Sequence, residues 1–418
     1  MKAIRCLLVL GFAAIFVLGM LGCQSSVLPN ESHSEAPLMT QDENNEIPSQ
    51  TAGSDSPEAF FEQSPIWVSE GEHVVFVSDN KLYAIMGENT DDLFGDVDTV
   101  EKPFDSDHEG DPIMMTAVDG PQLVEEDVKQ ALVFASGTTE WYYGGEHFAS
   151  LLYIKNDGSL WVRGSNRGGM FGSGERLDGI KILDDAVSVY CGTHSVSALK
   201  ENGEYYRWDY KAVNDGGIPT LISDNVAVGS NNDLLFLTTD KKLCCGNGKE
   251  TVVIADGVTG FSSDGIHVSA VFEDGTAKQY NMDIYELEKG RFVFNETEFV
   301  HDDVSCAGSG GAVSFVLKND GTLYGSFVGE WNVMKQLMTN VRSAAAVGGS
   351  LFAISENGGL YYIDYDRVSG NPTDTALIAN DVIACSPIGG NDDCLYVTAD
   401  GDLHYHSSVL EPVDYVIE

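Results

Sequence analysis

Three consecutive aromatic residues have a chemistry that suits binding better than catalysis. Trp141, Tyr142 and Tyr143 lie in the segment 138–146, whose other residues include glycines and glutamates. Trp and Tyr rings are enriched at binding surfaces because they offer a large contact area at a low entropic cost. Aromatic rings that cover the top of a packed sheet give the same pattern. We predict that this aromatic segment contacts a partner.

A second segment has the residue types of a metal site. Asp105, Asp107, Glu109 and Asp111 alternate with other residues before a run of apolar ones. Carboxylate oxygens suit calcium, but the twelfth residue counted from Asp105 is Thr116, whereas an EF-hand loop ends on glutamate. A solvated acidic loop has the same composition. The four acids remain a calcium candidate, and we otherwise predict no metal and no cofactor.

No set of residues has the spacing of a catalytic centre. His73, His194 and His267 recur at one place in the repeat described below, which favours a packing role. The sequence lacks a nucleophile elbow around a serine, and its cysteines and histidines lack zinc-site spacing. We therefore predict no catalytic residue and a protein that is not an enzyme.

The charge balance restricts the kind of partner. Lys and Arg number 23 and Asp and Glu number 65 among 418 residues, which gives a formal net charge of -42. Such a charge repels phosphate backbones, so we predict that nucleic acid is not a partner. The hydrophobic content of 43% is that of a globular protein.

The first residues read as a targeting signal. Lys2 and Arg5 precede an apolar run, which ends in Gly22 and Cys23. This ending resembles the lipobox of bacterial lipoproteins, and the resemblance implies cleavage before Cys23 and its lipidation. An ordinary signal peptide followed by an incidental cysteine is the alternative. We predict a signal peptide over 1–22 and an extracytoplasmic protein that contacts the membrane only through lipid.

The segment 23–65 has the composition of a flexible tether. It is rich in Ser, Pro, Glu, Asp and Asn and shows no apolar periodicity. Such a segment cannot bury enough apolar surface to fold by itself. We predict that it is disordered and separates the membrane from a folded part over 66–418.

Hairpins recur along the whole of 66–418. Eight segments show alternating apolar residues, a polar turn and further alternation, and the turn glycines recur at intervals such as 45 residues from Gly158 to Gly203. Asn-Gly or Asp-Gly, as at Asp157-Gly158, predicts a two-residue type I′ turn. Another short strand precedes most hairpins, and a fourth apolar piece follows several of them. The pattern predicts an all-β fold, a closed β-propeller of seven or eight four-stranded blades.

One unit carries a more specific motif. The residues GSNRGGMFGSG, from Gly164 to Gly174, resemble the GxNxxGxLGxG signature of RCC1-type repeats, and Leu93-Phe94-Gly95 belongs to a weaker copy. The resemblance implies the propeller fold, usually with seven blades, whereas eight hairpins are present. We expect Asn166 and the glycines to hold a tight turn. A last strand at 413–417 is expected to close the ring by pairing with the first unit.

The propeller topology places several candidate residues on one face. In a four-stranded blade, the loop after the first strand and the loop after the third strand emerge on the same side. The aromatic segment, Arg163 and Asn166 should therefore share a face, together with Trp208 and Tyr210 of the next unit. We predict that these residues form a partner-binding patch.

The cysteines of the folded part are expected to be structural. Cys191, Cys306 and Cys385 are placed at one position of the repeat, where a small buried side chain packs. Cys385 and Cys394 fall on neighbouring strands, so a disulfide between them stays open.

The sequence is compatible with three functions. Within the RCC1 resemblance, members bind proteins through the rigid ring, which favours a surface-tethered scaffold for an unknown protein. The aromatic segment also suits a cell-surface glycan, and a propeller enzyme acting on polysaccharide is the third alternative. A fold of this kind supports many functions, so the choice depends on the site.

Overall fold

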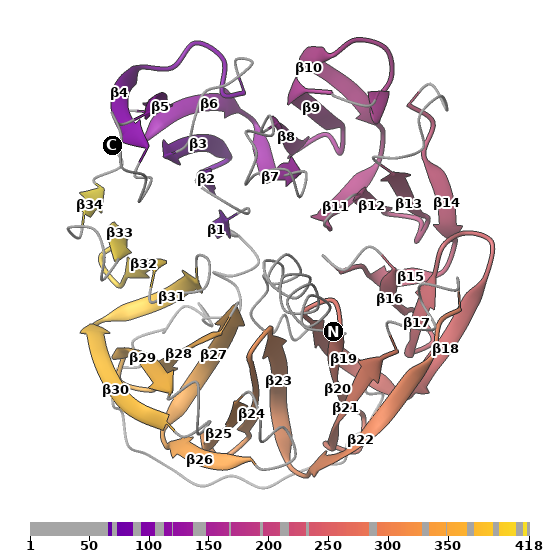
Figure 1. The fold of residues 1–418 in the computed structure, drawn as a ribbon, viewed down its shortest axis with the longest axis vertical. Helices are drawn as coiled ribbons and strands as arrows, with labels where there is room; N and C mark the ends of the chain where they lie inside the picture. Colours follow the sequence, from indigo (N-terminus) through magenta and orange to yellow (C-terminus); the bar gives the residue numbers. More distant parts are fainter. Residues whose placement is uncertain are drawn as a thin grey trace, which may run out of the picture.

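A computed structural model shows the protein as a ring of β-sheets (Figure 1). The structure describes residues 66–415 except 69–72, 87–92, 105–112, 119, 137–147, 167–168, 193–194, 210–216, 231–233, 284–290, 328–333, 348, 366–371, 388–392 and 407–412. Over these ranges the regular structure is entirely β-strand. Within them, no helix is long and apolar enough to cross a membrane.

Eight four-stranded antiparallel sheets follow one another around the ring, each made of strands in chain order. The first four blades contain β1 (Ile66–Val68), β2 (Val74–Ser78), β3 (Lys81–Met86) and β6 (Gln122–Glu126); β7 (Val128–Ser136), β8 (Phe148–Lys155), β9 (Leu160–Ser165) and β10 (Arg176–Leu183); β11 (Ala186–Cys191), β12 (Ser195–Lys200), β13 (Tyr205–Asp209) and β14 (Thr220–Ser223); and β15 (Val226–Val228), β16 (Leu235–Thr238), β17 (Lys242–Gly246) and β18 (Thr251–Asp256).

The other four blades complete the ring. They contain β19 (Val258–Ser263), β20 (His267–Phe272), β21 (Ala277–Met282) and β22 (Phe294–His301); β23 (Val304–Gly310), β24 (Val313–Lys318), β25 (Leu323–Phe327) and β26 (Lys335–Met338); β27 (Val341–Val347), β28 (Ser350–Ser355), β29 (Leu360–Tyr365) and β30 (Pro372–Ala379); and β31 (Val382–Pro387), β32 (Cys394–Thr398), β33 (Leu403–His406) and β34 (Val413–Tyr415). The propeller predicted from the sequence is confirmed, with eight blades.

Alternating side chains explain why these segments form blades. In β8, successive residues such as Leu151 and Leu152 point to opposite sides of the sheet, and both are fully buried. Leu151 belongs to the apolar cluster shared with the first blade, and Leu152 to the cluster shared with the third. The middle strands therefore bury both faces, and neighbouring blades are held together by apolar packing at each seam between them.

The hairpin turn of the second blade differs from the predicted type. At Asp157-Gly158, the amide of Gly158 donates to the carbonyl of Lys155 at 2.9 Å, and only Gly158 has a positive φ, of 83°. This is a three-residue loop with a left-handed glycine rather than a two-residue type I′ turn. The Asp157 carboxylate accepts the Ser159 amide at 2.9 Å and stabilises the loop. Asp79 and Asn80 of the first blade both have positive φ, as a type I′ turn requires.

Backbone hydrogen bonds link consecutive blades on the side of the ring where these turns lie, which we call the turn face. The amide of Ala186, at the start of β11, donates to the carbonyl of Gly158 in the previous blade at 2.8 Å. The amide of Val382 donates to Gly358 in the same way at 2.9 Å. Residues between blades, such as Asp185 and Asp381, take positive φ to make this tight passage.

The ring closes differently from the prediction. The last strand, β34, pairs with β33 of its own blade and not with the first unit. Side chains of the first and last blades pack into one apolar cluster instead, which includes Val74, Phe76, Leu395 and Tyr405. In the described part of the chain, no strand of the last blade pairs with a strand of the first blade. Each blade takes its four strands from its own stretch of the chain.

The cysteines do not share one position, contrary to the prediction. Their partners across the sheet lie one, two and four residues before the ends of the second strands, with Cys306 opposite Leu317, Cys385 opposite Tyr396 and Cys191 opposite Val196. Cys394 lies opposite Pro387 rather than Cys385, and no disulfide joins these two residues. A bulge in each of these three first strands makes the register hard to read from sequence.

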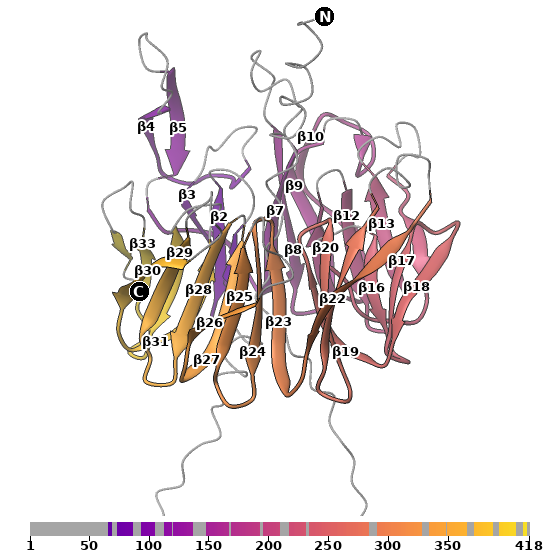
Figure 2. The same ribbon diagram turned by 60° about the horizontal axis from the view of Figure 1, so that its bottom comes forward.

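A two-stranded hairpin projects from the opposite side of the ring (Figure 2). Its strands β4 (Thr99–Phe104) and β5 (Ile113–Val118) lie between β3 and β6 of the first blade. The connections after first and third strands emerge on this side, which we call the loop face. The predicted calcium candidates Asp105, Asp107, Glu109 and Asp111 fall between β4 and β5 and lie outside the described residues.

Candidate binding site between the first two blades

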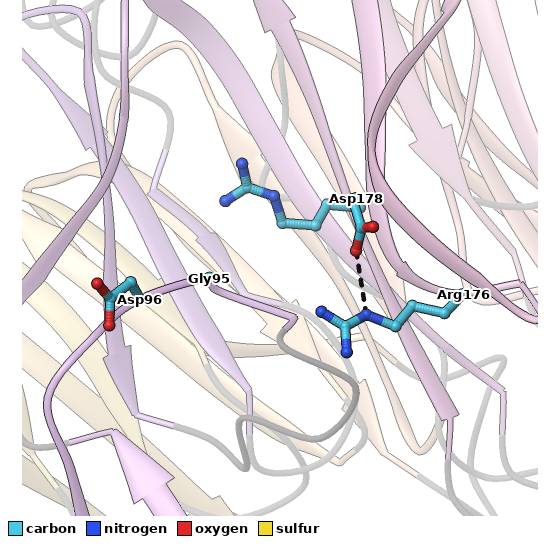
Figure 3. Close-up of a pocket in the computed structure, with 5 residues that line it drawn as sticks. Gly95, Asp96, Arg176 and Asp178 are labelled. Atoms are coloured by element: carbon cyan, nitrogen blue, oxygen red, sulfur yellow. Dashed lines mark hydrogen bonds and ion pairs between the residues drawn. The ribbon is translucent and has the colours of Figure 1, made fainter.

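A polar hollow opens at the seam between the first two blades (Figure 3). Its volume is about 380 Å³, and it is lined by Gly95, Asp96, Arg163, Arg176 and Asp178. Gly95 and Asp96 follow β3, Arg163 lies near the end of β9, and Arg176 and Asp178 lie at the start of β10. These positions are the loop-face ends of their strands. Nε of Arg176 donates to Oδ1 of Asp178 at 3.1 Å.

Arg163 is the residue that distinguishes this hollow. Its side chain is only 22% exposed, and its nearest ion-pair partner is the Glu125 carboxylate, with Nη2 4.0 Å from Oε2. Its guanidinium makes no hydrogen bond to any residue within the described ranges, although it carries five N–H donors. Because Arg163 lines the hollow, its unused donors can reach water or an acceptor on another molecule.

Two glycines make room for the guanidinium. Gly95 has a φ of 78°, and a Cβ built on it would lie 2.8 Å from Nη1 of Arg163. Gly179, beside a bulge of β10 and with a φ of 84°, would place a Cβ 3.6 Å from Nη2. A Cβ on Gly95 would require the end of the Arg163 side chain to move, whereas a Cβ on Gly179 would make an ordinary contact with it.

A second layer of polar groups lies beside Arg163. The Glu125 carboxylate of β6 accepts from the Tyr153 hydroxyl at 3.3 Å and pairs with Nζ of Lys155 at 3.1 Å. Burial, and then the Glu125 charge, raise the pKa of Tyr153 to about 12. Nζ of Lys155 also lies 5.5 Å from the centre of the Trp161 ring. These contacts join the two blades below the hollow.

Asn166 holds the motif loop together, as the sequence predicts. Its Nδ2 donates to the carbonyls of Gly172 at 3.1 Å and Gly174 at 2.8 Å, and its Oδ1 accepts the Phe171 amide at 2.9 Å. The glycines Gly164 and Gly174 both take positive φ. Because the Asn166 side chain is 2% exposed, it is not available to a partner, which corrects its place in the predicted patch.

Trp208 is also inside the molecule. It is 2% exposed, its ring lies 6.2 Å from that of Phe171, and its indole N–H donates to the Gly217 carbonyl at 3.2 Å. It closes the seam between the second and third blades rather than facing solvent. The prediction that Trp208 contacts a partner is therefore corrected as well.

For most of the other residues of the predicted patch, contact with a partner stays a prediction. Trp141, Tyr142 and Tyr143 and also Tyr210 lie outside the described residues. The paired ends of β7 and β8, which flank the aromatic segment, meet at Ser136 and Phe148 on the loop face. Arg163 lies on that face, as predicted, although its contact with a partner is untested.

The other four residues that line the hollow were not predicted from the sequence. Gly95 and Asp96 come from one blade, and Arg176 and Asp178 come from another, so no spacing in the chain connects them. One signal was present. When the third strands are aligned on Leu160 and Tyr205, Arg163 stands where the next blade has Trp208.

The hollow has the chemistry of a binding site. It offers guanidinium donors and carboxylate acceptors around a space open to solvent. Among the residues that the structure describes, no three His, Cys, Asp or Glu side chains are grouped to hold a metal ion. The arrangement suits recognition of a polar group on another molecule.

Comparisons with known proteins agree on the fold. No family model matches the chain, and no curated protein matches it. It is similar to the structure of Prp20p from Saccharomyces cerevisiae, the yeast RCC1, at 15% identity over 80% of this chain and 93% of that one, with a TM-score of 0.44. Human WBSCR16 (14% identity, 76% and 81% covered, TM-score 0.41) and AztD from Citrobacter koseri (9%, 83% and 94%, 0.45) are also similar. The propeller fold is shown by the eight four-stranded blades themselves, and these similarities carry no information on partners.

Proposed function

We propose that the chain is a surface-tethered scaffold that binds a protein partner through the loop face around the Arg163 hollow. The observation that carries the proposal is a departure from the repeat. A position that is apolar and closed at the next seam, at Trp208, is charged and open at this one. Proteins place largely buried arginines at interfaces because the guanidinium binds planar acceptors with defined geometry.

Other features of the same face support a partner of protein size. The β4–β5 hairpin projects beside the first blade (Figure 2), and in the sequence the aromatic segment falls between β7 and β8 of the second blade. The hollow lies at the seam between these two blades. A partner that fills the hollow would also be within reach of the β4–β5 hairpin, and aromatic and arginine side chains commonly dominate binding energy.

The tether is the second part of the proposal. A lipid on Cys23, following a signal peptide over 1–22, would hold the chain at the outside of a bacterial cell membrane, with 23–65 as a spacer. Labelling cells with a palmitate analogue tests this step. Label on the wild type and none on Cys23→Ala supports the lipid anchor, whereas equal label on both contradicts it.

Affinity capture tests the binding function. The full chain with a C-terminal tag would be solubilised from cell envelopes in detergent, and proteins retained by it compared with those retained by Arg163→Trp and by Trp141→Ala/Tyr143→Ala. Lys249→Gln removes one positive charge from an exposed loop of another blade on the same face and is the matched control.

The outcomes separate the three functions that the sequence leaves open. A protein retained by the wild type and the control but lost from the variants supports the proposal. Retention of purified glycans, or turnover of a polysaccharide by the wild type, in the absence of any variant-dependent protein would replace it.

A further inference from the structure

We infer that the Arg163 hollow is a socket for a single carboxylate side chain of the partner protein. The inference rests on the proposed function and specifies the chemistry of its contact. It starts from the guanidinium of Arg163, which lines the hollow and makes one ion-pair contact with the part of the chain that the structure describes, at 4.0 Å.

The shape of the donor group selects the ligand. A guanidinium presents its N–H donors as a planar fork, which matches the two oxygens of a carboxylate in a bidentate pair. Gly95 has no Cβ next to Nη1 of Arg163, where a Cβ would lie 2.8 Å away, so a planar group that approaches Nη1 meets no side chain of this residue. A neutral amide offers one acceptor oxygen and would satisfy fewer donors.

The surrounding charges limit how much negative charge the ligand can carry. Asp96 and Asp178 line the hollow with Arg163 and Arg176, and Glu125 lies next to Arg163. A second negative charge on the ligand would therefore meet carboxylates as well as arginines. The net charge of -42 also disfavours a polyanion at longer range. A monoanionic carboxylate fits this balance better than a phosphate.

The space is adequate for a side chain together with water. A volume of about 380 Å³ falls at the small end of the range of about 300–1,000 Å³ for ligand sites. The hollow lies at the loop-face ends of β9 and β10, so a side chain on a partner's surface can enter it without opening the ring.

Ligand-observed NMR tests the inference on the detergent-solubilised full chain. The probes are the peptides Ac-Gly-Glu-Gly-NH2 and Ac-Gly-Gln-Gly-NH2, succinate and inorganic phosphate, at concentrations on the order of millimolar. The protein variants are Arg163→Trp, which introduces the residue that the next blade has at this position, and Arg163→Lys, which keeps the positive charge but removes the planar fork of guanidinium donors. Lys249→Gln is the control, and urea midpoints establish that each variant is folded.

We expect the wild type and Lys249→Gln to broaden the glutamate peptide signals and to leave the glutamine peptide unchanged. Arg163→Trp should bind the glutamate peptide at least about tenfold more weakly, and Arg163→Lys at least several-fold more weakly. No broadening of the glutamate peptide by the wild type, or equal broadening by Arg163→Trp, overturns the inference. Arg163-dependent binding that is stronger for phosphate, or that occurs with succinate alone, overturns it by assigning another ligand.

The two proposals fail in different ways. If affinity capture finds a protein that binds Arg163→Trp as well as the wild type, the scaffold stands and the socket is wrong. If the glutamate peptide binds but capture finds no variant-dependent protein, the socket stands and the proposed protein-binding function is wrong.

Discussion

The two seams that flank the second blade differ at one position of the repeat. On β9, Arg163 lies opposite Leu151 and faces the first blade; on β13 of the next blade, Trp208 lies opposite Val196 and faces the second blade. Each stands three residues after the first residue of its strand. The preceding blade offers both residues a similar loop, Leu93-Phe94-Gly95 in one case and Met170-Phe171-Gly172 in the other.

The consequences of this single difference are large. Trp208 packs on Phe171 and the seam between the second and third blades is filled. Arg163 meets Gly95 across the seam between the first and second blades, and a hollow remains beside it. The comparison indicates that the ring supplies a fixed geometry, and that the side chain at this position decides whether a seam is filled or keeps a hollow.

The largest expected effect is at the filled seam. Trp208→Ala should lower the free energy of unfolding by about 3–5 kcal/mol, because it leaves a cavity between two blades. Urea denaturation followed by circular dichroism measures the change. Trp161→Ala, at a half-buried ring of β9, is the control and should cost clearly less. Equal losses in the two variants would show that Trp208 is not a seam residue.

Glycines on the two seams should respond differently to alanine. A Cβ on Gly217 would lie 2.4 Å from the backbone nitrogen of Gly172, whereas one on Gly95 would meet the end of the Arg163 side chain, which can move. We expect Gly217→Ala to cost about 2–4 kcal/mol, from left-handed strain plus overpacking, and Gly95→Ala about 1–2 kcal/mol. Thermal and urea unfolding of both variants check the order, and a larger loss in Gly95→Ala would contradict it.

The polar seam should also respond to alkaline pH. The pKa of Tyr153 is raised to about 12 from its ordinary value of 10.0, so between these values the folded chain keeps a proton that the unfolded chain loses. The free energy of unfolding should therefore fall as the pH rises from about 10 to about 12. The Tyr153 contribution is present below pH 10 and lost through pH 12. At the filled seam, Ala198 occupies the equivalent position and does not titrate.

Tyr153→Phe isolates this effect from other tyrosines. Between these pH values the wild type should lose about 1–3 kcal/mol more than the variant, as measured by urea unfolding at each pH. Equal losses would mean that the Tyr153 hydroxyl is not held between the two blades as described.

The sequence predicted the architecture well because each blade is local. Eight hairpins gave eight blades, and the Asn166 motif was correctly assigned to loop structure. Ring closure was predicted wrongly, since strand order does not reveal whether β34 pairs with β33 or with the first blade. The burial of Trp208 was also missed, because a tryptophan near a strand end, before Asp209 and Tyr210, looks like a loop residue.

The candidate site could be predicted only in part. Arg163 was placed on the loop face from strand direction alone. Its position at a seam could not be predicted, because that position depends on the approach of Gly95 from another blade. Contacts between blades leave no spacing signal in the chain. Comparing the third strands of the second and third blades would have shown that an arginine stands where the next blade has a core tryptophan.

The substitution Arg163→Trp is the sharpest test of binding at the seam between the first two blades, because it gives the open seam the residue of the filled one. Capture of the partner by the full-length variant would be measured beside urea unfolding, with Lys249→Gln as the control. We predict that the free energy of unfolding changes by less than about 1 kcal/mol, because the larger side chain fills space without disturbing the blades. The amount of partner captured should fall at least about tenfold. Undiminished capture by a stably folded Arg163→Trp chain would contradict the claim that this seam is the binding site.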